Sequence, residues 1–507
     1  MKRFMNVENL SFTYENNIEP LFQDSSFQIE QGWSAIVGAN GSGKTTLLKL
    51  MCGLLTPDSG SLSIPGATYY AEQRTDLPPN GFNDFFDSTE KQAYKTKESL
   101  QILDHWRDNW DVLSHGERKR CQIAAALYQE PLILAIDEPS NHLDLRSKKV
   151  LLKALNSFRG IGLLVSHDRE LMDQLCQHTI FIHPPNIEVR KCSYSVAALE
   201  MERETKSKNE QHELAKREVK KLKKKVTRQR EKASRADKLR SKRNLNPKDH
   251  DAKSKKDLAR LTGKDSVDGR AQNRLQSRLN HAQTQQAGMT FKKSYTQGIT
   301  FDVEEASRLF PIIVPAHTFS LGENKSLKTP ELTVQFGDKI GLIGDNGAGK
   351  STLLRHVMNT TTLPSERVIH IPQEIPADTS EAVLRRIDEY SSDKKGRIMS
   401  LIRRLGSDPT HVLATTVPTP GEVRKLLLAE GLLLNPSIII MDEPTNHMDL
   451  SSIECIEEAL KESACAQVLV SHDMAFLKKT INHYWAFEEE GKNEYRVVER
   501  FVNADSL

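Results

Sequence analysis

The sequence predicts an α/β fold with two homologous domains that are joined by a long α-helical hairpin. Three observations carry this prediction. A set of motifs occurs twice, each copy places a glycine-rich loop between an apolar run and a helix-forming run, and a basic segment almost free of glycine and proline separates the copies. The 507 residues leave room for at least two hydrophobic cores, which excludes a single small domain.

The repeat consists of three motifs in the same order. The copies are GANGSGKT (Gly38–Thr45) and GDNGAGKS (Gly344–Ser351), DEPSNHLD (Asp137–Asp144) and DEPTNHMD (Asp442–Asp449), and VSHD (Val165–Asp168 and Val470–Asp473). The separation is 306 residues for the first motif and 305 for the other two. We therefore expect homologous domains at residues 1–194 and 290–507, with a linker at 195–289.

Each copy is expected to be built on buried parallel strands. The apolar runs do not alternate with polar residues, which is typical of strands that are covered on both faces. The expected strands are Ser34–Val37, Leu132–Ile136, Gly162–Val165, Ile340–Ile343, Ile438–Met441 and Gln467–Val470. A helix should follow each glycine loop, because KTTLL at Lys44 and KSTLL at Lys350 are runs of helix-compatible residues.

The linker is strongly basic, whereas the remainder of the chain is acidic. Residues 201–287 hold 27 Lys and Arg against 12 Asp and Glu, a net charge of +15, and the rest carries −12. A helix over Met201–Arg243, with a seam of Leu214, Val219, Leu222 and Val226, would be about 65 Å long. Breaks at Asn244–Pro247 and Gly263–Gly269 should form an irregular tip before a second helix, Arg270–Gln286. Such a surface suits a polyanion, although a solvated hairpin that only spaces the domains is the alternative.

Composition narrows the class of protein further. Mean hydropathy is −0.53, and no run of 18 or more apolar residues occurs, which excludes a membrane-spanning helix. The first ten residues lack a secretory signal, and the six cysteines are scattered singly. We therefore expect a soluble, cytoplasmic protein with reduced thiols and without a disulfide framework or a zinc or iron–sulfur cluster.

The glycine loops are the predicted phosphate-binding sites. Backbone N–H groups and a helix N-terminus bind oxyanions that bulkier side chains would keep away, and two matches at equal spacing argue against ordinary glycine turns. Lys44 and Lys350 should contact the β and γ phosphates of a bound nucleotide, and Thr45 and Ser351 should bind Mg²⁺. The full predicted set is Gly38, Ala39, Asn40, Gly41, Ser42, Gly43, Lys44, Thr45 and Thr46, and Gly344, Asp345, Asn346, Gly347, Ala348, Gly349, Lys350, Ser351 and Thr352.

The paired carboxylates predict hydrolysis of the bound nucleotide. An apolar strand that ends in Asp-Glu places one carboxylate at the metal and the next at the attacking water. Asp137 and Asp442 fit the Mg²⁺ role, directly or through water, and Glu138 and Glu443 fit the general base. His167 and His472 each follow a strand and a serine, where they could contact the γ-phosphate.

These motifs resemble the ATP-binding cassette superfamily over both flanking domains. Leu113-Ser114-His115-Gly116-Glu117 is similar to the family's signature sequence, so Ser114, Gly116 and Glu117 would contact ATP held by the opposite domain. By the same resemblance Gln73 and Gln373 would contact the metal, and Tyr14 would stack on adenine. The second signature, Pro418-Thr419-Pro420-Gly421-Glu422, departs from the pattern, although Thr419 keeps a hydroxyl and Gly421 and Glu422 keep their places.

Two cassettes with a charged helical linker and the Glu-Pro-Ser/Thr-Asn-His form resemble the ABC-F class. This resemblance implies a monomer with intramolecular cassette pairing that binds the ribosome in the ATP state. Its linker, here Arg228–Arg243 and Asn244–Arg270, would face ribosomal RNA near the peptidyl-transferase centre, with no membrane or DNA partner. A translation factor and an antibiotic-resistance protein both fit. The ATPase subunit of a membrane importer is the alternative, but it needs no linker of net charge +15; a chromosome-maintenance ATPase would need a far longer coiled coil.

Overall fold

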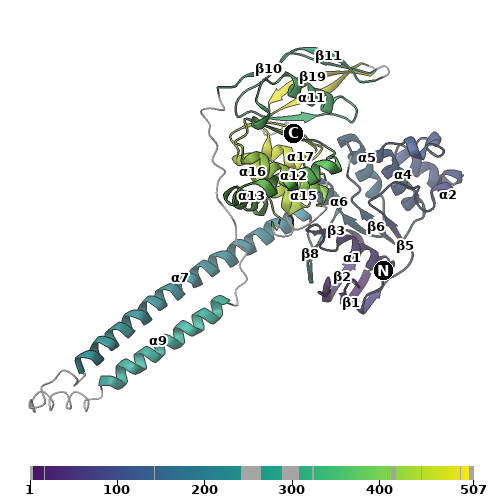
Figure 1. The fold of residues 1–507 in the computed structure, drawn as a ribbon. Helices are drawn as coiled ribbons and strands as arrows, with labels where there is room; N and C mark the ends of the chain where they lie inside the picture. Colours follow the sequence, from purple (N-terminus) through teal and green to yellow (C-terminus); the bar gives the residue numbers. More distant parts are fainter. Residues whose placement is uncertain are drawn as a thin grey trace, which may run out of the picture. The chain divides into compact units, whose positions relative to one another are not determined.

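The computed structural model describes most of the chain, and Figure 1 shows its elements. The described residues are 4–15, 18–141, 143–240, 264–287, 308–322, 325–407, 409, 412, 418–446, 448–491 and 493–501. The chain divides into two compact units. One is Met1–Ala197 with Gln297–Leu507, which holds both α/β domains, and the other is Ala198–Thr296, which holds the helical hairpin.

The first α/β domain is built on a six-stranded sheet. The strand order is β5 (Thr68–Ala71), β6 (Ile133–Asp137), β7 (Ile161–Val165), β3 (Gly32–Gly38), β8 (His178–His183) and β9 (Asn186–Arg190). All neighbours pair in parallel except β8 and β9. A separate antiparallel sheet has the order β2 (Phe22–Glu30), β1 (Phe4–Phe12) and β4 (Ser59–Ser63).

The second α/β domain repeats this core within an eight-stranded sheet. The order is β11 (His317–Ser320), β12 (Ser326–Thr329), β19 (Glu494–Phe501), β18 (His483–Gly491), β14 (Lys339–Ile343), β17 (Ala466–Val470), β16 (Ile438–Asp442) and β15 (Val368–Ile371). A two-stranded sheet pairs β10 (Ile312–Val314) with β13 (Leu332–Val334). Strands β14 to β17 pair in parallel, as β3, β5, β6 and β7 do in the first domain.

Helices connect these strands in both domains. In the first they are α1 (Lys44–Met51), α2 (Phe82–Asp87), α3 (Lys91–Ser99), α4 (His115–Tyr128), α5 (Leu145–Leu155) and α6 (Arg169–Leu175). In the second they are α11 (Lys350–Thr360), α12 (Ala377–Glu389), α13 (Ser392–Arg404), α15 (Pro420–Leu432), α16 (Leu450–Glu462) and α17 (Met474–Thr480). The predicted α/β fold is therefore confirmed, with all six expected strands present to within a residue or two.

The predicted strands lie in the cores. Every residue of β6, β7, β16 and β17 is buried, which accounts for their continuous apolar sequences. The side chains of β3 and α1 pack with these strands in the first domain, and those of β14 and α11 do so in the second. Because both faces of each sheet are buried, the ends of these strands are held in place. The candidate site residues lie at these strand ends.

Both glycine loops use backbone that favours glycine. Gly43 has φ 93° and Gly349 has φ 99°, and the helices α1 and α11 begin at the next residue. A Cβ atom on Gly43 would lie 2.8 Å from Leu21 Cδ2, and one on Gly349 would lie 2.9 Å from Leu327 Cδ2. Glycine at these two positions therefore keeps the loops tight enough to present their N–H groups at the helix N-termini.

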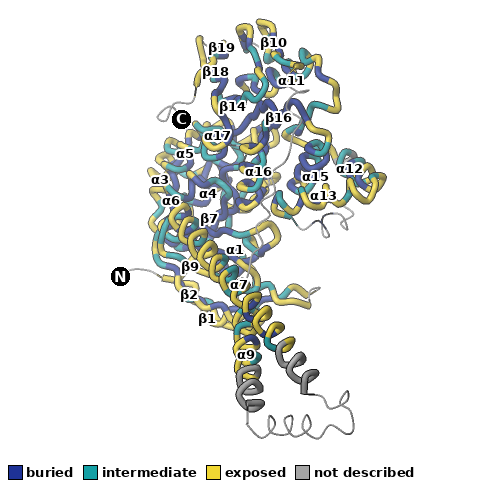
Figure 2. Tube along the Cα trace, turned by 90° about the vertical axis from the view of Figure 1, so that its left-hand side faces the viewer, coloured by how far each residue is buried: buried dark blue, intermediate teal, exposed yellow. Residues whose placement is uncertain are grey.

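The second unit contains two helices, α7 (Tyr194–Arg240) and α9 (Lys264–Ala287), so the predicted hairpin helices are confirmed. They pack through an apolar seam of Val219, Leu222, Val226 and Leu279, and both are otherwise largely exposed (Figure 2). Two details of the prediction are wrong. Leu214 is 63% exposed, because it lies beyond this seam, and the interruption expected through Gly269 is helical from Lys264, since one glycine costs a helix only about 1 kcal/mol. The expected break at 244–247 lies outside the described residues.

Candidate functional site

The first candidate site surrounds the loop between β3 and α1. Lys44 Nζ donates hydrogen bonds to the main-chain oxygens of Gly38 and Ala39, at 2.9 and 3.1 Å, so the lysine closes its own loop. A cavity of about 480 Å³ lies beside it. Its lining includes the predicted residues Tyr14, Asn40, Gly41, Gly43, Lys44, Thr45, Thr46, Gln73, Asp137, Glu138 and His167.

Hard oxygen ligands meet at the N-terminus of α1. Thr45 Oγ1 donates to Asp137 Oδ2 at 2.7 Å, and the Tyr70 hydroxyl donates to the same carboxylate oxygen at 3.2 Å. Gln73 lines the same cavity. Hydroxyl, carboxylate and amide oxygens are the ligands that Mg²⁺ takes in nucleotide sites, so this donor set fits the metal.

Glu138 sits immediately after β6 in strained backbone. Its φ is 48°, in the left-handed region that non-glycine residues rarely adopt, and its main-chain N–H donates to Val165 O at 2.8 Å. Burial and the neighbouring Asp137 carboxylate raise the pKa of Glu138 to about 8. His167 Nε2 lies 3.1 Å from Glu138 Oε1, and burial together with the Lys44 cation lowers the pKa of His167 to about 3. A neutral histidine therefore faces the carboxyl group.

The second candidate site repeats this arrangement around the loop between β14 and α11. Lys350 Nζ donates to the oxygens of Gly344 and Asp345, at 2.8 and 3.0 Å, and Ser351 Oγ donates to Asp442 Oδ2 at 2.7 Å. Glu443 has φ 49°, and burial raises its pKa to about 7. Among the described residues, Glu443 Oε1 is a buried oxygen that accepts no hydrogen bond.

His472 lies against both the loop and the carboxylate of the second site. Its Nε2 is 3.0 Å from Asn346 Oδ1 and 3.6 Å from Glu443 Oε1, and its main-chain N–H donates to Glu443 Oε2 at 3.3 Å. Burial and the Lys350 cation lower the pKa of His472 to about 3. The imidazole therefore lies between the loop and the carboxylate as a neutral group.

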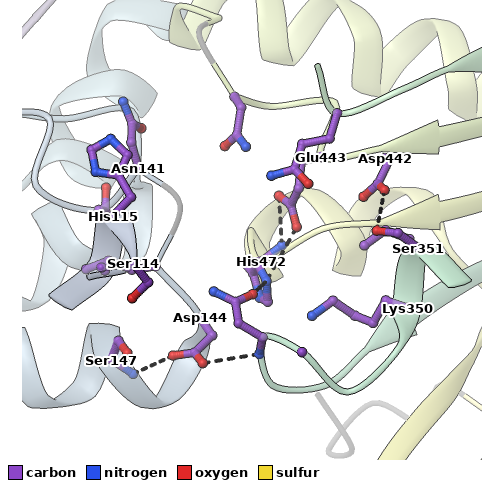
Figure 3. Close-up of a pocket in the computed structure, with 18 of the residues that line it drawn as sticks. Ser114, His115, Asn141, Asp144, Ser147, Lys350, Ser351, Asp442, Glu443 and His472 are labelled. Carbon is purple, nitrogen blue, oxygen red and sulfur yellow. Dashed lines mark hydrogen bonds and ion pairs between the residues drawn. The ribbon is translucent and has the colours of Figure 1, made fainter. Parts of the chain in front are cut away.

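The first signature opens into the second site. Ser114, Gly116 and Glu117 share a cavity of about 920 Å³ with Lys350, Ser351 and Gln373. Figure 3 shows Ser114 across this cavity from Lys350 and Ser351. Ser114 is the N-cap of α4, where Glu117 Oε2 accepts from the Ser114 hydroxyl at 2.7 Å. The residues that the resemblance assigned to one sandwiched nucleotide are thus brought together.

The second signature keeps the local geometry of the first. Thr419 caps α15, and Glu422 Oε2 accepts from the Thr419 hydroxyl at 2.8 Å, so threonine reproduces the capping box that Ser114 makes. In the part of the chain that the structure describes, this signature does not share a cavity with the opposite loop. Among the described residues, none of Thr419, Gly421 and Glu422 lines the cavity around Lys44.

The aromatic residues at the two cavities differ. Tyr14 is 45% exposed at the first cavity and its hydroxyl is 2.7 Å from Thr46 Oγ1. The second cavity is lined by Ser320 and Leu321 at the end of β11. Phe319 packs instead against His356, with ring centroids 5.0 Å apart. The first cavity therefore offers an aromatic face, and the described lining of the second offers an apolar side chain.

Sequence reasoning missed contacts between the two domains. Asp449 Oδ2 accepts from the main-chain N–H of Asn40 at 2.8 Å, and Asp144 Oδ2 accepts from that of Asn346 at 3.3 Å. Each aspartate is also the N-cap of its own helix, α16 or α5. The signal was available, because each aspartate ends a repeated eight-residue motif.

The comparisons with known proteins agree with this geometry. The ABC transporter family matches residues 22–141 and 327–446, the two segments that run from just before each glycine loop to beyond each Asp-Glu pair. The chain is a tandem ATP-binding cassette protein. Its cassette domains bind ATP and hydrolyse it.

Relatives of this tandem cassette protein match nearly its whole length. The ribosome protection protein VmlR of Bacillus subtilis is 27% identical, over 97% of this chain and 88% of its own. The erythromycin resistance ATP-binding protein MsrA of Staphylococcus epidermidis is 26% identical, over 92% and 93%. These relatives support the ABC-F class for the protein.

A solved structure supports the fold of this tandem cassette protein. A complex of the archaeal ribosomal stalk protein aP1 with the ribosome recycling factor aABCE1 matches with a TM-score of 0.60 and 17% identity, over 97% of this chain and 90% of that one. In the described part of the chain, no helix is both long and apolar enough to cross a membrane.

Proposed function

We propose that this protein is a cytoplasmic, ribosome-associated ATPase that acts on the ribosome through its basic helical linker. The observation that carries the proposal is the combination of two glycine loops, each with its Asp-Glu pair, with a helical linker of net charge +15 over residues 201–287. A relative named as a ribosome protection protein, which matches 97% of this chain, supports the ribosome as the partner. A second relative, named for erythromycin resistance, supports a role in antibiotic resistance.

In each site the chain would position ATP through its glycine loop. The N–H groups at the start of α1 and α11 would face the phosphates, with Lys44 or Lys350 exchanging loop oxygens for phosphate oxygens. Thr45, Asp137 and Gln73 would hold Mg²⁺ in the first site, and Ser351, Asp442 and Gln373 in the second. The metal would neutralise charge on the phosphates.

Glu138 and Glu443 would then accept a proton from the attacking water. A general base works best when its pKa lies near the working pH, and burial places these two carboxyls near that range. His167 and His472 would hold each carboxylate in place and contact the γ-phosphate. Ser114, Gly116 and Glu117 would complete the site of Lys350, while Thr419, Gly421 and Glu422 would complete that of Lys44 after the domains close.

The hairpin would supply attraction to RNA. Helix α7 has 47 residues, which corresponds to about 70 Å, and its exposed Lys and Arg side chains suit phosphate contacts. The cassettes carry net negative charge and would add little to that attraction. ATP binding would favour the bound state and hydrolysis would release it.

The test is ribosome binding by the double variant Glu138→Gln/Glu443→Gln. With ATP it should co-sediment with ribosomes through sucrose, because glutamine cannot accept the water's proton and the nucleotide persists. The matched control adds Lys44→Ala and Lys350→Ala, which should prevent both nucleotide binding and co-sedimentation. Retention with a membrane fraction in place of ribosomes would instead support an importer subunit. Imaging the trapped complex, and assaying translation with and without antibiotics, would separate a housekeeping factor from a resistance protein.

A further inference from the structure

Each signature helix carries a buried cation at the same position. Lys119 in α4 and Arg424 in α15 are separated by 305 residues, the spacing of the repeat, and each is 2% exposed. Lysine and arginine are rarely buried without a carboxylate partner, since removing the charge from water is costly. Neither side chain forms a salt bridge in the described part of the chain, so the hydrogen bonds of both cations go to other groups, although Arg424 Nε is buried and donates none.

Lys119 binds the main chain of two site segments. Its Nζ donates to Glu72 O at 2.6 Å, on the segment that leads to Gln73, and to Asp137 O at 3.2 Å, at the end of β6. A third oxygen, that of Gln73, lies at 3.5 Å. The ammonium group thus donates its hydrogen bonds to the main chain at two predicted metal ligands, Gln73 and Asp137.

Arg424 makes the corresponding contacts in the second cassette. Its Nη1 donates to Glu443 O at 3.0 Å and to Asn446 O at 2.6 Å, and its Nη2 donates to Gln373 O. The chemical group differs from that of Lys119, yet the connected segments are the same. Two chemically different cations bind the glutamine segment and the Asp-Glu turn of their cassettes. This repetition indicates a common role beyond packing.

Lys119 and Arg424 both lie on helices that begin with a signature. Lys119 lies five residues after Ser114, and Arg424 lies five residues after Thr419, so each cation moves with the helix that carries a signature. The first signature shares a cavity with the glycine loop of the opposite cassette, whereas the carbonyls that each cation binds belong to the site of the cation's own cassette. A displacement of the signature helix therefore acts directly on that site's glutamine segment and on its Asp-Glu turn.

We propose that Lys119 and Arg424 are positioning residues that couple each signature helix to the metal and catalytic residues of its own cassette. Docking of nucleotide against one signature would then align the glutamine and the general base of the other site. The proposal concerns ATP turnover alone and holds whether or not the partner is the ribosome.

Methionine substitution removes the charge and the donors while keeping an unbranched side chain of similar length. In Lys119→Met and Arg424→Met, measured in the full-length protein, we expect kcat for ATP to fall about tenfold while binding of a fluorescent ATP analogue changes less than twofold. Each variant protein still has one unaltered ATP site, whose turnover would mask the loss. Lys119→Met is therefore also measured with Glu443→Gln, and Arg424→Met with Glu138→Gln, so that only the affected site hydrolyses ATP.

Lys425 provides the matched control. It is a buried cation on the same helix, 6% exposed, but it donates to Ser407 Oγ at 2.8 Å and to Ser452 Oγ at 2.5 Å rather than to the glutamine segment or the Asp-Glu turn. Lys425→Met should lower the melting temperature as much as Arg424→Met does and leave kcat within twofold. Equal losses of kcat in the two variants would overturn the proposal, because burial of any cation on α15 would then explain them.

Exchange of the two cations provides a second arm if the methionine variants are unstable. Lys119→Arg and Arg424→Lys install the group that the other cassette uses, and each should retain at least half of the kcat. Hydrogen exchange should remain slow at the segments around Gln73 and Gln373 in these variants. Loss of turnover in both exchanges with an unchanged melting temperature would refute a shared positioning role.

Discussion

A buried ion pair between the cassettes allows a quantitative test of the assembly. Arg169 Nη1 lies 2.8 Å from Glu457 Oε1, with side chains 8% and 6% exposed, and Lys479 Nζ lies 2.9 Å from the other oxygen of the same carboxylate. The positions that correspond under the 305-residue repeat are Met474 and Leu152. One side of the cassette pair therefore uses charge where the equivalent side has apolar residues.

Removing Arg169 alone should destabilise the protein. Breaking a buried pair costs about 3–5 kcal/mol, because the remaining charge loses its partner. Since Lys479 still contacts Glu457, we expect Arg169→Met to cost about 3 kcal/mol, at the low end of that range. The double variant Arg169→Met/Glu457→Leu copies the apolar pair and leaves no unpaired carboxylate, so it should recover to within about 1 kcal/mol of the parent protein.

The assay is a double-mutant cycle in urea, followed by far-ultraviolet circular dichroism and tryptophan fluorescence. The expected result is a coupling energy of about 2 kcal/mol or more between Arg169 and Glu457 in the apparent free energy of unfolding. Lys328→Met, which removes an exposed ion pair with Glu494, is the control and should change stability by less than about 1 kcal/mol. Additive effects of Arg169→Met and Glu457→Leu would refute the reasoning, since independent side chains cannot form a functioning pair.

Three further predictions concern the sites and the linker. Burial opposes ionisation of Asp449, yet hydrogen bonds from Ser452 and Asn40 lower its pKa to about 2. Asp449→Asn should therefore lower the free energy of unfolding by about 2 kcal/mol at pH 7. This difference, measured in urea, should shrink between about pH 4 and pH 2. Glu443→Gln should reduce ATP turnover more than Glu138→Gln does in a steady-state assay, and equal losses would count against unequal sites. Replacing 244–270 with a short Gly/Ser connection should preserve ATP binding and abolish effects on translation. Charge reversal at Arg228 and Arg230 should weaken ribosome association and flatten its salt dependence. If the protein without 244–270 still affected translation, the hairpin would be only a spacer.

The elements that sequence predicts well are those whose signals are local. Continuous apolar runs such as Ile438–Met441 can be satisfied only by burial on both sides, so strand identity and parallel pairing follow directly. The glycine loops are equally local, because Gly43 and Gly349 must adopt positive φ where a helix begins. The same reasoning fails at Leu214, since an apolar side chain at helical spacing says nothing about where the partner helix ends.

What sequence could not predict depends on contacts between distant segments. Lys119 and Arg424 look like ordinary charges of a surface helix, and only the folded chain shows that main-chain oxygens surround them. The left-handed backbone of Glu138 and Glu443 is likewise invisible in composition, because nothing about glutamate favours positive φ. These exceptions to local preference gather at the candidate sites, where strain and buried charge are maintained by the surrounding fold.

The aspartate contacts between the cassettes repeat, but other mutual contacts do not, and this difference gives the expected inequality of the sites a physical basis. Lys148 in α5 donates to the main-chain oxygen of His472 at 3.0 Å while its Nζ lies 2.6 Å from Asp168 Oδ2. Its counterpart is Ile453, a buried apolar residue that offers no donor to His167. The first cassette thus supplies both Ser114 and a cation to the site of Lys350. Among the described residues of the second cassette, Thr419 does not line the cavity of Lys44, and Ile453 offers that site no cation. A site that already holds its opposite signature needs less rearrangement before hydrolysis, which is why the loss should be greater for Glu443→Gln.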